Sequence, residues 1–206
     1  MARDTNERAA QQSGAPFSLP AWLSTLSEPP PIVQAGARVL RHRAESVPSS
    51  LLATPALRDL VQVMTEVMRR APGVGLAAPQ IGINRKIVIF RNKGFDEEHW
   101  SRKERDYDLL INPRITQTRG EPVKGAEGCL SCPEVQVEVY RFPEIKVRAY
   151  DIKGNRISKR YEDFLARIAQ HEIDHLDGRL IVDYEGPIYF PKEKKSFFER
   201  IFAKIT

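Results

Sequence analysis

The sequence predicts an α+β fold, in which short antiparallel or mixed β-sheets pack around a central metal-binding helix. Two observations favour this class. Apolar residues recur at helical spacing over residues 161–176, whereas several short stretches within residues 86–161 alternate apolar and polar residues as strands do. A chain of 206 residues that is 41% hydrophobic can bury one core, so a single domain is expected.

The first expected element is an amphipathic helix over Pro55–Arg70, with its apolar residues on one side (Leu57, Leu60, Val61, Met64, Val67 and Met68). Strands are expected near residues 86–90, 109–111, 135–139, 144–150 and 156–161. Residues 151–155 (DIKGN) are typical of a hairpin connection between the last two strands. The second helix follows, and Gly178 marks its expected end.

The second helix carries the pattern QHEIDHL at residues 170–176. Residues i and i+4 of an α-helix lie on one side about one turn apart, so His171 and His175 can bind the same metal ion. Glu172 stands beside them as a general base for metal-activated water. All three fall on the apolar side of the helix, where ionisable groups are costly unless a metal or hydrogen bonds compensate them. The alternative is a chance occurrence of the pattern on a surface helix.

A catalytic site of the zinc type needs a third protein ligand and one position left for water. One protease class supplies a later histidine, but Ile181 holds that position here, which excludes the class. His42 and His99 lie in charge-rich segments and are interpreted as solvated residues. Cys129 is the better candidate, because a thiolate binds borderline-soft divalent ions and the adjacent Gly128 allows a tight turn and close approach to a ligand. The alternative for Cys129 is a small buried hydrophobe.

Cys129 and Cys132 also form a C-x-x-C pattern. A zinc ribbon would need a second pair, and the chain has only two cysteines. A redox motif would be expected to open a helix, whereas Pro133 and an alternating strand pattern follow here. We therefore interpret Cys132 as a neighbour of the ligand that packs beside it or oxidises.

A third segment, GVGLAAPQ at residues 73–80, looks at first like a dinucleotide-binding loop. Such a loop follows a strand and opens a helix, whereas this one follows a helix and Pro79 blocks another from starting. We interpret the segment as a stretch of small side chains that lets a peptide lie against its backbone. Gln80 would present its side-chain amide to that peptide. The alternative is an ordinary loop rich in Gly and Pro.

Together the three segments resemble the peptide deformylase family, whose motifs they match in order as GVGLAAPQ, EGCLS (residues 127–131) and QHEIDHL. The resemblance covers much of the chain, residues 35–185. It implies three metal ligands, one thiolate and two imidazoles (Cys129, His171 and His175). It also implies that Glu172 is the catalytic residue, and that the Gln80 amide and the Leu130 backbone N–H hold the formyl oxygen.

The resemblance further implies the reaction: a metal-dependent hydrolase removes the formyl group from the N-terminal formylmethionine of newly made polypeptides and releases formate. Ligand softness alone favours zinc, whereas the resemblance implies Fe²⁺, which Ni²⁺, Co²⁺ or Zn²⁺ replaces readily. Val74 and Gly75 are expected to pair with the peptide backbone as an added strand, and Gly128 to allow its close approach. Phe164 is expected in the apolar pocket for the methionine side chain.

Composition suggests three regions: a flexible N-terminal extension over residues 1–35, a catalytic metallohydrolase domain over residues 36–190 and a basic C-terminal helix over residues 191–206. The net charge is +5, and one hypothesis for the basic helix is docking to ribosomal RNA. The alternative is a solvated helix with one side packed on the domain. No run approaches the ~18 apolar residues of a membrane span, and neither membrane nor DNA is expected as a partner.

The cytoplasm is the expected compartment, because two cysteines suit a reducing environment and the N-terminus resembles neither a signal nor a transit peptide. Two other functions stay open at this point. A zinc endopeptidase using the same helix would cleave internal peptide bonds and leave residues 73–80 without a role. A metal-stabilised binding protein without catalysis would keep its function when Glu172 is replaced by glutamine.

Overall fold

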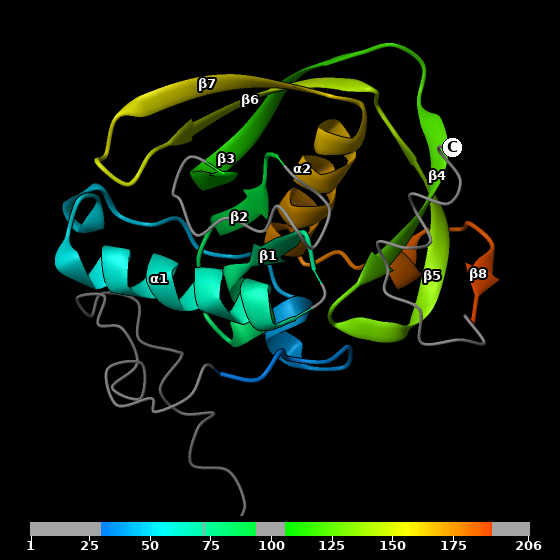
Figure 1. Cartoon of the computed structure of the whole chain (residues 1–206), viewed down its shortest axis with the longest axis horizontal. Helices are drawn as coiled ribbons and strands as arrows, with labels where there is room; N and C mark the ends of the chain where they lie inside the picture. The colour runs from blue at the N-terminus through cyan, green and yellow to red at the C-terminus, as the bar shows by residue number, and fades with distance from the viewer. Residues whose placement is uncertain (1–29, 72, 94–105, 191–206) are drawn as a thin grey trace, which may run out of the picture.

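The structure, a computed structural model, describes residues 30–71, 73–93 and 106–190 (Figure 1). Two α-helices, α1 (Pro55–Arg70) and α2 (Asp163–Leu176), pack with two β-sheets. The predicted α+β class is confirmed, and α1 has the predicted bounds. Short 3-10 helices connect the larger elements: η2 (Arg38–Leu40), η3 (Ser49–Leu51), η4 (Ala78–Ile81) and η6 (Ile181–Asp183).

The larger sheet has five strands in the order β1-β2-β3-β6-β7, and each neighbouring pair is antiparallel. Its strands are β1 (Gly75–Ala77), β2 (Ile87–Arg91), β3 (Tyr107–Arg119), β6 (Glu144–Tyr150) and β7 (Arg156–Glu162). The smaller sheet has the order β4-β5-β8, with β4 (Val123–Cys129), β5 (Cys132–Arg141) and β8 (Ile188–Tyr189). Figure 1 shows the chain passing from β3 into β4 and back from β5 into β6, and a third connection runs from β7 through α2 and η6 to β8.

The two helices pack on opposite sides of the larger sheet. α2 contacts β1, β2, β6 and β7 and shares a core with residues such as Phe90, Leu110 and Val147. α1 contacts β1 and β2 and shares a second core that includes Met64, Ile89 and Ile111. Leu110 and Ile111 are neighbours in β3, and they enter different cores because successive strand residues point to opposite faces.

Thr54 caps α1 by accepting a hydrogen bond from the Leu57 N–H at 3.3 Å. The predicted hairpin between β6 and β7 is confirmed. The Asp151 carboxylate accepts hydrogen bonds from the backbone N–H groups of Lys153 and Asn155 at 2.9 and 2.8 Å. Gly154 has a φ of +81°, which a residue with a side chain rarely adopts.

Two strands of the site region were not expected from the sequence. β1 reads GLA and β4 reads VKGAEGC, and both are rich in Gly and Ala, which favour strands weakly. Backbone pairing with β2 and with β5 makes them strands despite this composition. β3 also extends well beyond the predicted residues 109–111.

Part of the predicted N-terminal extension is attached to the domain. The Val33 N–H donates to the Gln80 carbonyl at 2.8 Å, and the Ala35 N–H donates to the Ser131 carbonyl at 2.8 Å. Residues 1–29 and the predicted C-terminal helix over residues 191–206 lie outside the described residues. No helix in the described ranges has the length and apolar character that a membrane span requires.

Candidate metal centre

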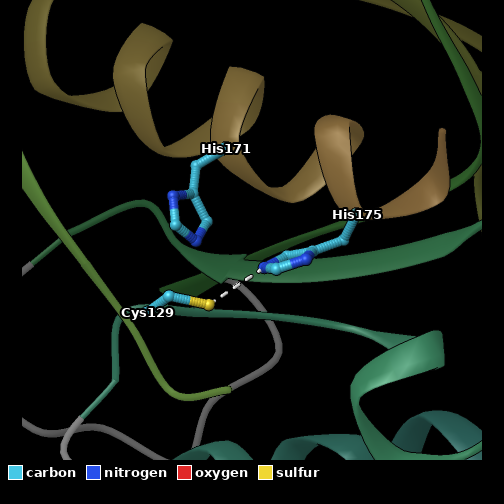
Figure 2. Close-up of side chains that lie close together, drawn as sticks. All are labelled: Cys129, His171 and His175. Atoms are coloured by element: carbon cyan, nitrogen blue, oxygen red, sulfur yellow. Dashed lines mark hydrogen bonds between the residues drawn. The ribbon is translucent and has the colours of Figure 1, made fainter. Parts of the chain in front are cut away.

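Helix α2 presents both histidines of the QHEIDHL pattern on the same side, as Figure 2 shows. The centroids of the His171 and His175 rings lie 5.0 Å apart. The helix is held in place by its apolar residues, such as Ile168, Ala169 and Ile173, which belong to the core beneath the larger sheet. It ends where predicted: Gly178 has a φ of +77°, and its N–H donates to the His175 carbonyl at 3.3 Å.

Cys129 comes to the histidines from the last residue of β4, at the turn into β5. One ligand atom from each of Cys129, His171 and His175 lies within 4.8 Å of the other two. The Cys129 Sγ and His175 Nε2 are 3.4 Å apart. Metal–sulfur and metal–nitrogen bonds of about 2.3 and 2.1 Å at a tetrahedral angle put these atoms roughly 3.6 Å apart. The three residues therefore fit a divalent cation without a fourth protein ligand in this group.

The hydrogen bond with the Cys132 thiol, together with burial, raises the pKa of the Cys129 thiol well above its ordinary value. A cation that binds here must displace this proton. Cys132 lies directly opposite Cys129 across the turn, is a buried free thiol, and packs in the same apolar cluster as Leu40 and Val137.

Glu172 lies inside the site with only 4% of its surface exposed. A Cβ added to Gly75 would lie 2.2 Å from the Glu172 Oε1, so the carboxylate rests against the bare backbone of β1. The Glu172 Oε2 is buried without a hydrogen-bond partner among the described residues. Burial raises the pKa of Glu172 to about 7 despite the positive charge of His171. A buried carboxyl poised near neutrality is suited to accept and return a proton.

A second carboxylate, Glu127, orients His171. Its Oε2 lies 3.0 Å from the His171 Nδ1, which places the imidazole proton on Nδ1 and leaves Nε2 to bind a cation. Arg141 donates to both Glu127 oxygens at 2.9 Å, and Arg167 donates to Oε1 at 2.9 Å. Glu127 therefore links the metal helix to β4 and β5.

The pKa values of these groups follow from the pairing. Burial raises the pKa of Glu127, but the hydrogen bonds from His171 and Arg141 outweigh it and hold the pKa below its ordinary range. Burial lowers the pKa of His171, but the hydrogen bond to Glu127 and the charge of Glu172 outweigh it and raise that pKa. Burial and the charge of His171 lower the pKa of His175 well below its ordinary value, so His175 is neutral, as a metal ligand must be.

The network continues behind Glu127. The Arg141 guanidinium also donates to the Asp174 carboxylate at 2.5 Å and to the Tyr184 hydroxyl at 2.6 Å. The Tyr184 hydroxyl in turn donates to Asp174 at 2.5 Å. Arg141 is thus fixed by α2 on one side and by the segment after η6 on the other.

Gln80 is held with its amide nitrogen toward Cys129 and Ser131. Its Oε1 accepts from the Ala77 N–H at 2.9 Å, while its Nε2 donates to the Ser131 hydroxyl at 3.2 Å and to the Cys129 Sγ at 3.7 Å. Leu130, the next predicted residue, lies in the turn between β4 and β5, and its half-buried side chain packs on the α1 core.

The predicted substrate residues are placed in different ways. Val74 is buried, and its carbonyl accepts from the Arg91 N–H at 2.8 Å, so this residue already pairs within the sheet. Gly75 begins β1, an edge strand of the five-stranded sheet, and directly contacts Glu172. Gly128 is a strand residue of β4 beside a bulge and has no positive φ, so the expected tight turn at this glycine is wrong. Phe164 is half-buried in the first turn of α2 and packs on the α2 core.

Sequence reasoning missed Glu127 and Arg141 as functional residues. Glu127 stands in the EGCLS motif and could have been found, because a metal-bound histidine almost always donates its second N–H to a carboxylate or carbonyl. Arg141 lies at the end of a strand pattern with no local signal of burial. Only the pairing of β4 with β5 brings it to Glu127.

Comparisons with known proteins agree on one family. The family model described as "Polypeptide deformylase" matches residues 29–188. A peptide deformylase of Desulforudis audaxviator is 38% identical over 162 residues, which span 79% of this chain and 97% of the relative. A peptide deformylase of Symbiobacterium thermophilum is 41% identical over 152 residues, which span 74% of this chain and 64% of that longer relative.

Solved structures show the same likeness. The class I type b peptide deformylase of Acinetobacter baumannii with Met-Ala-Ser bound has a TM-score of 0.70 at 32% identity, covering 77% of this chain and 99% of that one. A peptide deformylase of Synechococcus elongatus in complex with actinonin has a TM-score of 0.68 at 33% identity, covering 87% of this chain and 90% of that one.

Proposed function

Because the chain belongs to the polypeptide deformylase family, we infer that it is a metal-dependent hydrolase acting on newly made polypeptides. It removes the formyl group from their N-terminal formylmethionine and releases formate. The single observation that carries this proposal within the molecule is the convergence of Cys129, His171 and His175, with Glu172 buried beside them.

Cys129, His171 and His175 are the proposed metal ligands, and Fe²⁺ is the proposed ion, with Zn²⁺, Ni²⁺ or Co²⁺ as substitutes. A divalent cation held by three protein ligands would lower the pKa of a water molecule toward neutrality and would polarise a carbonyl oxygen. The buried set of one sulfur and two nitrogens supports a borderline-soft cation of this kind.

Glu172 is the proposed proton carrier. Its buried carboxylate accepts a proton from the attacking water as the water oxygen bonds to the formyl carbon. When the bond between the formyl carbon and the amide nitrogen breaks, Glu172 returns this proton to the nitrogen. The products are a free N-terminal amine and formic acid, which carries the second water proton and becomes formate when it releases that proton; Glu172 ends the cycle as it began. In the metal-free site, burial raises the pKa of this carboxyl to about 7, which shows that the surroundings of Glu172 favour its uptake of a proton.

Gln80 and the Leu130 backbone N–H are the proposed donors to the formyl oxygen, where negative charge develops during attack. The placement of the Gln80 amide supports this role, because its carbonyl is occupied by Ala77 and its nitrogen faces the Cys129 sulfur. Both N–H bonds of Gln80 are engaged here, and the long 3.7 Å contact with the Cys129 Sγ is the one that it would exchange for the formyl oxygen.

The nascent peptide is proposed to lie along the outer edge of β1, next to Val74 and Gly75. β2 pairs with one side of β1, and β1 is the terminal strand of its sheet, so the other side is available to an added strand. Gly128 and Phe164 remain proposed contacts, the latter with the methionine side chain.

Formate release from a formyl-Met peptide tests the proposed function. Iron-loaded protein is prepared under anaerobic conditions, and a casein digestion is run with the same sample. We expect formate and new amine in equal amounts, no casein cleavage, and loss of turnover when a chelator removes the metal. Casein cleavage without formate release would instead favour the endopeptidase that the helix motif alone allows.

Two finer proposals concern the setting of the enzyme. We propose the cytoplasm as its compartment, supported by two free thiols. Docking of residues 191–206 to ribosomal RNA also stays a proposal, because that segment lies outside the described residues. Deletion of residues 192–206 tests it through co-sedimentation with ribosomes at two salt concentrations, and unchanged binding would dismiss it.

A further inference from the structure

One face of the five-stranded sheet changes character along its length. On the side opposite α2, Ile111 of β3 and its partner Tyr150 of β6 pack on the α1 core. Beyond them on the same face, Arg114 of β3 pairs with Arg148 of β6, and both side chains are exposed. Figure 1 shows α2 on the other side of β6 and β7, and no described helix over this end of the sheet. The face therefore passes from an apolar, helix-covered part to an open, cationic part.

The open part places like charges directly opposite each other. Arg114 faces Arg148 across the β3–β6 pair, and Lys146 faces Arg160 across the β6–β7 pair. Directly opposed like charges destabilise a sheet by a few tenths of a kcal/mol to about 1 kcal/mol. Two such pairs side by side on one face are not explained by the stability of the fold.

Carboxylates compensate little of this charge. The face carries six cations and two carboxylates, Glu144 and Glu162 (the cations are Arg114, Arg119, Lys146, Arg148, Arg156 and Arg160). Glu144 is shared, at 3.5 Å from Arg119 and 3.3 Å from Arg160. Within the described ranges, no salt bridge forms to the side chains of Arg114, Lys146, Arg148 or Arg156. With six cations against two carboxylates, the face carries a net charge of +4.

We propose that the open face of β3, β6 and β7 binds the sugar-phosphate backbone of RNA. Neighbouring strands stand about 4.8 Å apart and alternate residues of one strand about 6.8 Å apart, so the arginines form a grid at the scale of successive phosphates. Exposed neutral side chains between them, such as Gln117 and Ser158, are donors that also bind phosphate oxygens.

The side chains of this face favour RNA as the ligand over a membrane or another protein. The exposed large apolar residues of the described chain are Val123, Tyr140, Ile188, Tyr189 and Phe190, all in or next to the smaller sheet. The cationic face therefore has no apolar side chains to insert into a membrane or to form the dry centre of a protein interface. RNA is chosen over DNA because the proposed function places the enzyme where polypeptides are being made, and on this point the inference rests on that function.

The test compares two triple variants of the full chain in their metal-loaded form. The first, R114Q/R148Q/R156Q, removes three unpaired cations from the face. The second, R38Q/R58Q/K93Q, removes the same charge from three exposed residues elsewhere. Binding of a labelled single-stranded RNA of mixed sequence is measured by fluorescence anisotropy at several KCl concentrations. Phosphatidylserine vesicles serve as a second polyanion, and formyl-Met peptide turnover is recorded for each protein.

We expect the first variant to bind RNA at least about tenfold more weakly at low salt, with the slope of log K against log[KCl] reduced by about 2. The second variant should bind as the wild type does, and turnover on a short peptide should be unchanged in both. Equal weakening in the two variants would overturn the proposal, because net charge alone would then explain binding. Binding to vesicles without binding to RNA would also overturn it. Loss of the proposed function would appear separately, as absent formate release in the wild type.

Discussion

On the α2 side of the five-stranded sheet, buried charges are held by opposite charges or strong donors, whereas cations on the open part of the other side face water with few partners. Asp108 on the α2 side accepts hydrogen bonds from Lys159 at 2.7 Å and Tyr161 at 2.6 Å. Arg148 on the open side faces another arginine. A buried charge needs an opposite charge or hydrogen bonds to offset its lost hydration. A solvated charge is stable without a partner and is therefore available to bind a ligand.

This difference predicts where substitutions have large effects. Removing one partner of a buried pair leaves the other charge uncompensated, which typically costs several kcal/mol. Removing an exposed charge changes stability by about 0.5 kcal/mol or less. Glu172 stands apart, because its buried carboxylate is left without a strong partner, as expected for a group that must exchange a proton.

The largest effect is expected for Glu172→Gln. The amide keeps the shape of the side chain but cannot accept a proton, so turnover should fall by about 10²–10⁴-fold. Metal content should remain that of the wild type, because Glu172 is not one of the three proposed ligands. Formate release and metal analysis check this, with Glu185→Gln as a matched exposed control. Turnover within tenfold of the wild type would remove Glu172 from the proton path.

Gly75→Ala should disturb the same Glu172 carboxylate, because Gly75 of β1 packs directly against it. The new Cβ would lie 2.2 Å from the Glu172 Oε1, so the carboxylate must move. A displacement of about 1 Å at a catalytic group can cost roughly 10²-fold in rate. We expect a loss of that size in kcat with normal metal content. An alanine variant with wild-type kcat would show that the carboxylate has room to adjust.

Glu127→Gln should weaken the metal site without touching a ligand. The amide cannot hold the His171 Nδ1 proton and the Arg141 guanidinium as a carboxylate does. Loss of such a supporting group typically lowers metal affinity about 10- to 100-fold. Competition with a chromophoric chelator measures the change, with Glu185→Gln again as the control. Unchanged affinity would mean that β4 and β5 position His171 by packing alone.

The pH dependence of stability offers a fourth comparison. The pKa of Glu172 in the folded, metal-free protein is about 7, above its ordinary value of 4.5. Between these values the folded state holds a proton that the unfolded state has lost, so this residue lowers stability as pH rises from 4.5 to 7. Glu172→Gln removes this contribution, with a slope difference of about 1.4 kcal/mol per pH unit. Denaturant titrations of both metal-free proteins across this window measure it, and parallel curves would contradict the raised pKa.

The sequence predicted the site residues that lie together on one helix. It missed those that come together only when two strands pair. His171, Glu172 and His175 lie on one helix, so their spacing alone places them together. Thiolate chemistry made Cys129 a candidate for the third ligand, but only the resemblance decided between a ligand and a buried thiol, because no local pattern distinguishes the two. Glu127 and Arg141 depend on the register of β4 against β5, and a strand as poor in β-branched residues as β4 gives no signal of that register.

The smallest expected effect lies on the open face, and it is a gain in stability. Arg148→Glu replaces the Arg114–Arg148 opposition with an ion pair at the same register position, so the protein should become about 0.2–1 kcal/mol more stable. Thermal or denaturant unfolding at low salt measures the gain, which should shrink as salt rises. Turnover should be unchanged, because the residue lies on the side of the sheet away from the proposed metal ligands. A loss of stability would show that the two arginines are compensated by neighbours in the wild type. A gain in stability would mean that the wild-type arginines make the fold less stable than a single substitution could. This is expected if the face is used to bind an anion.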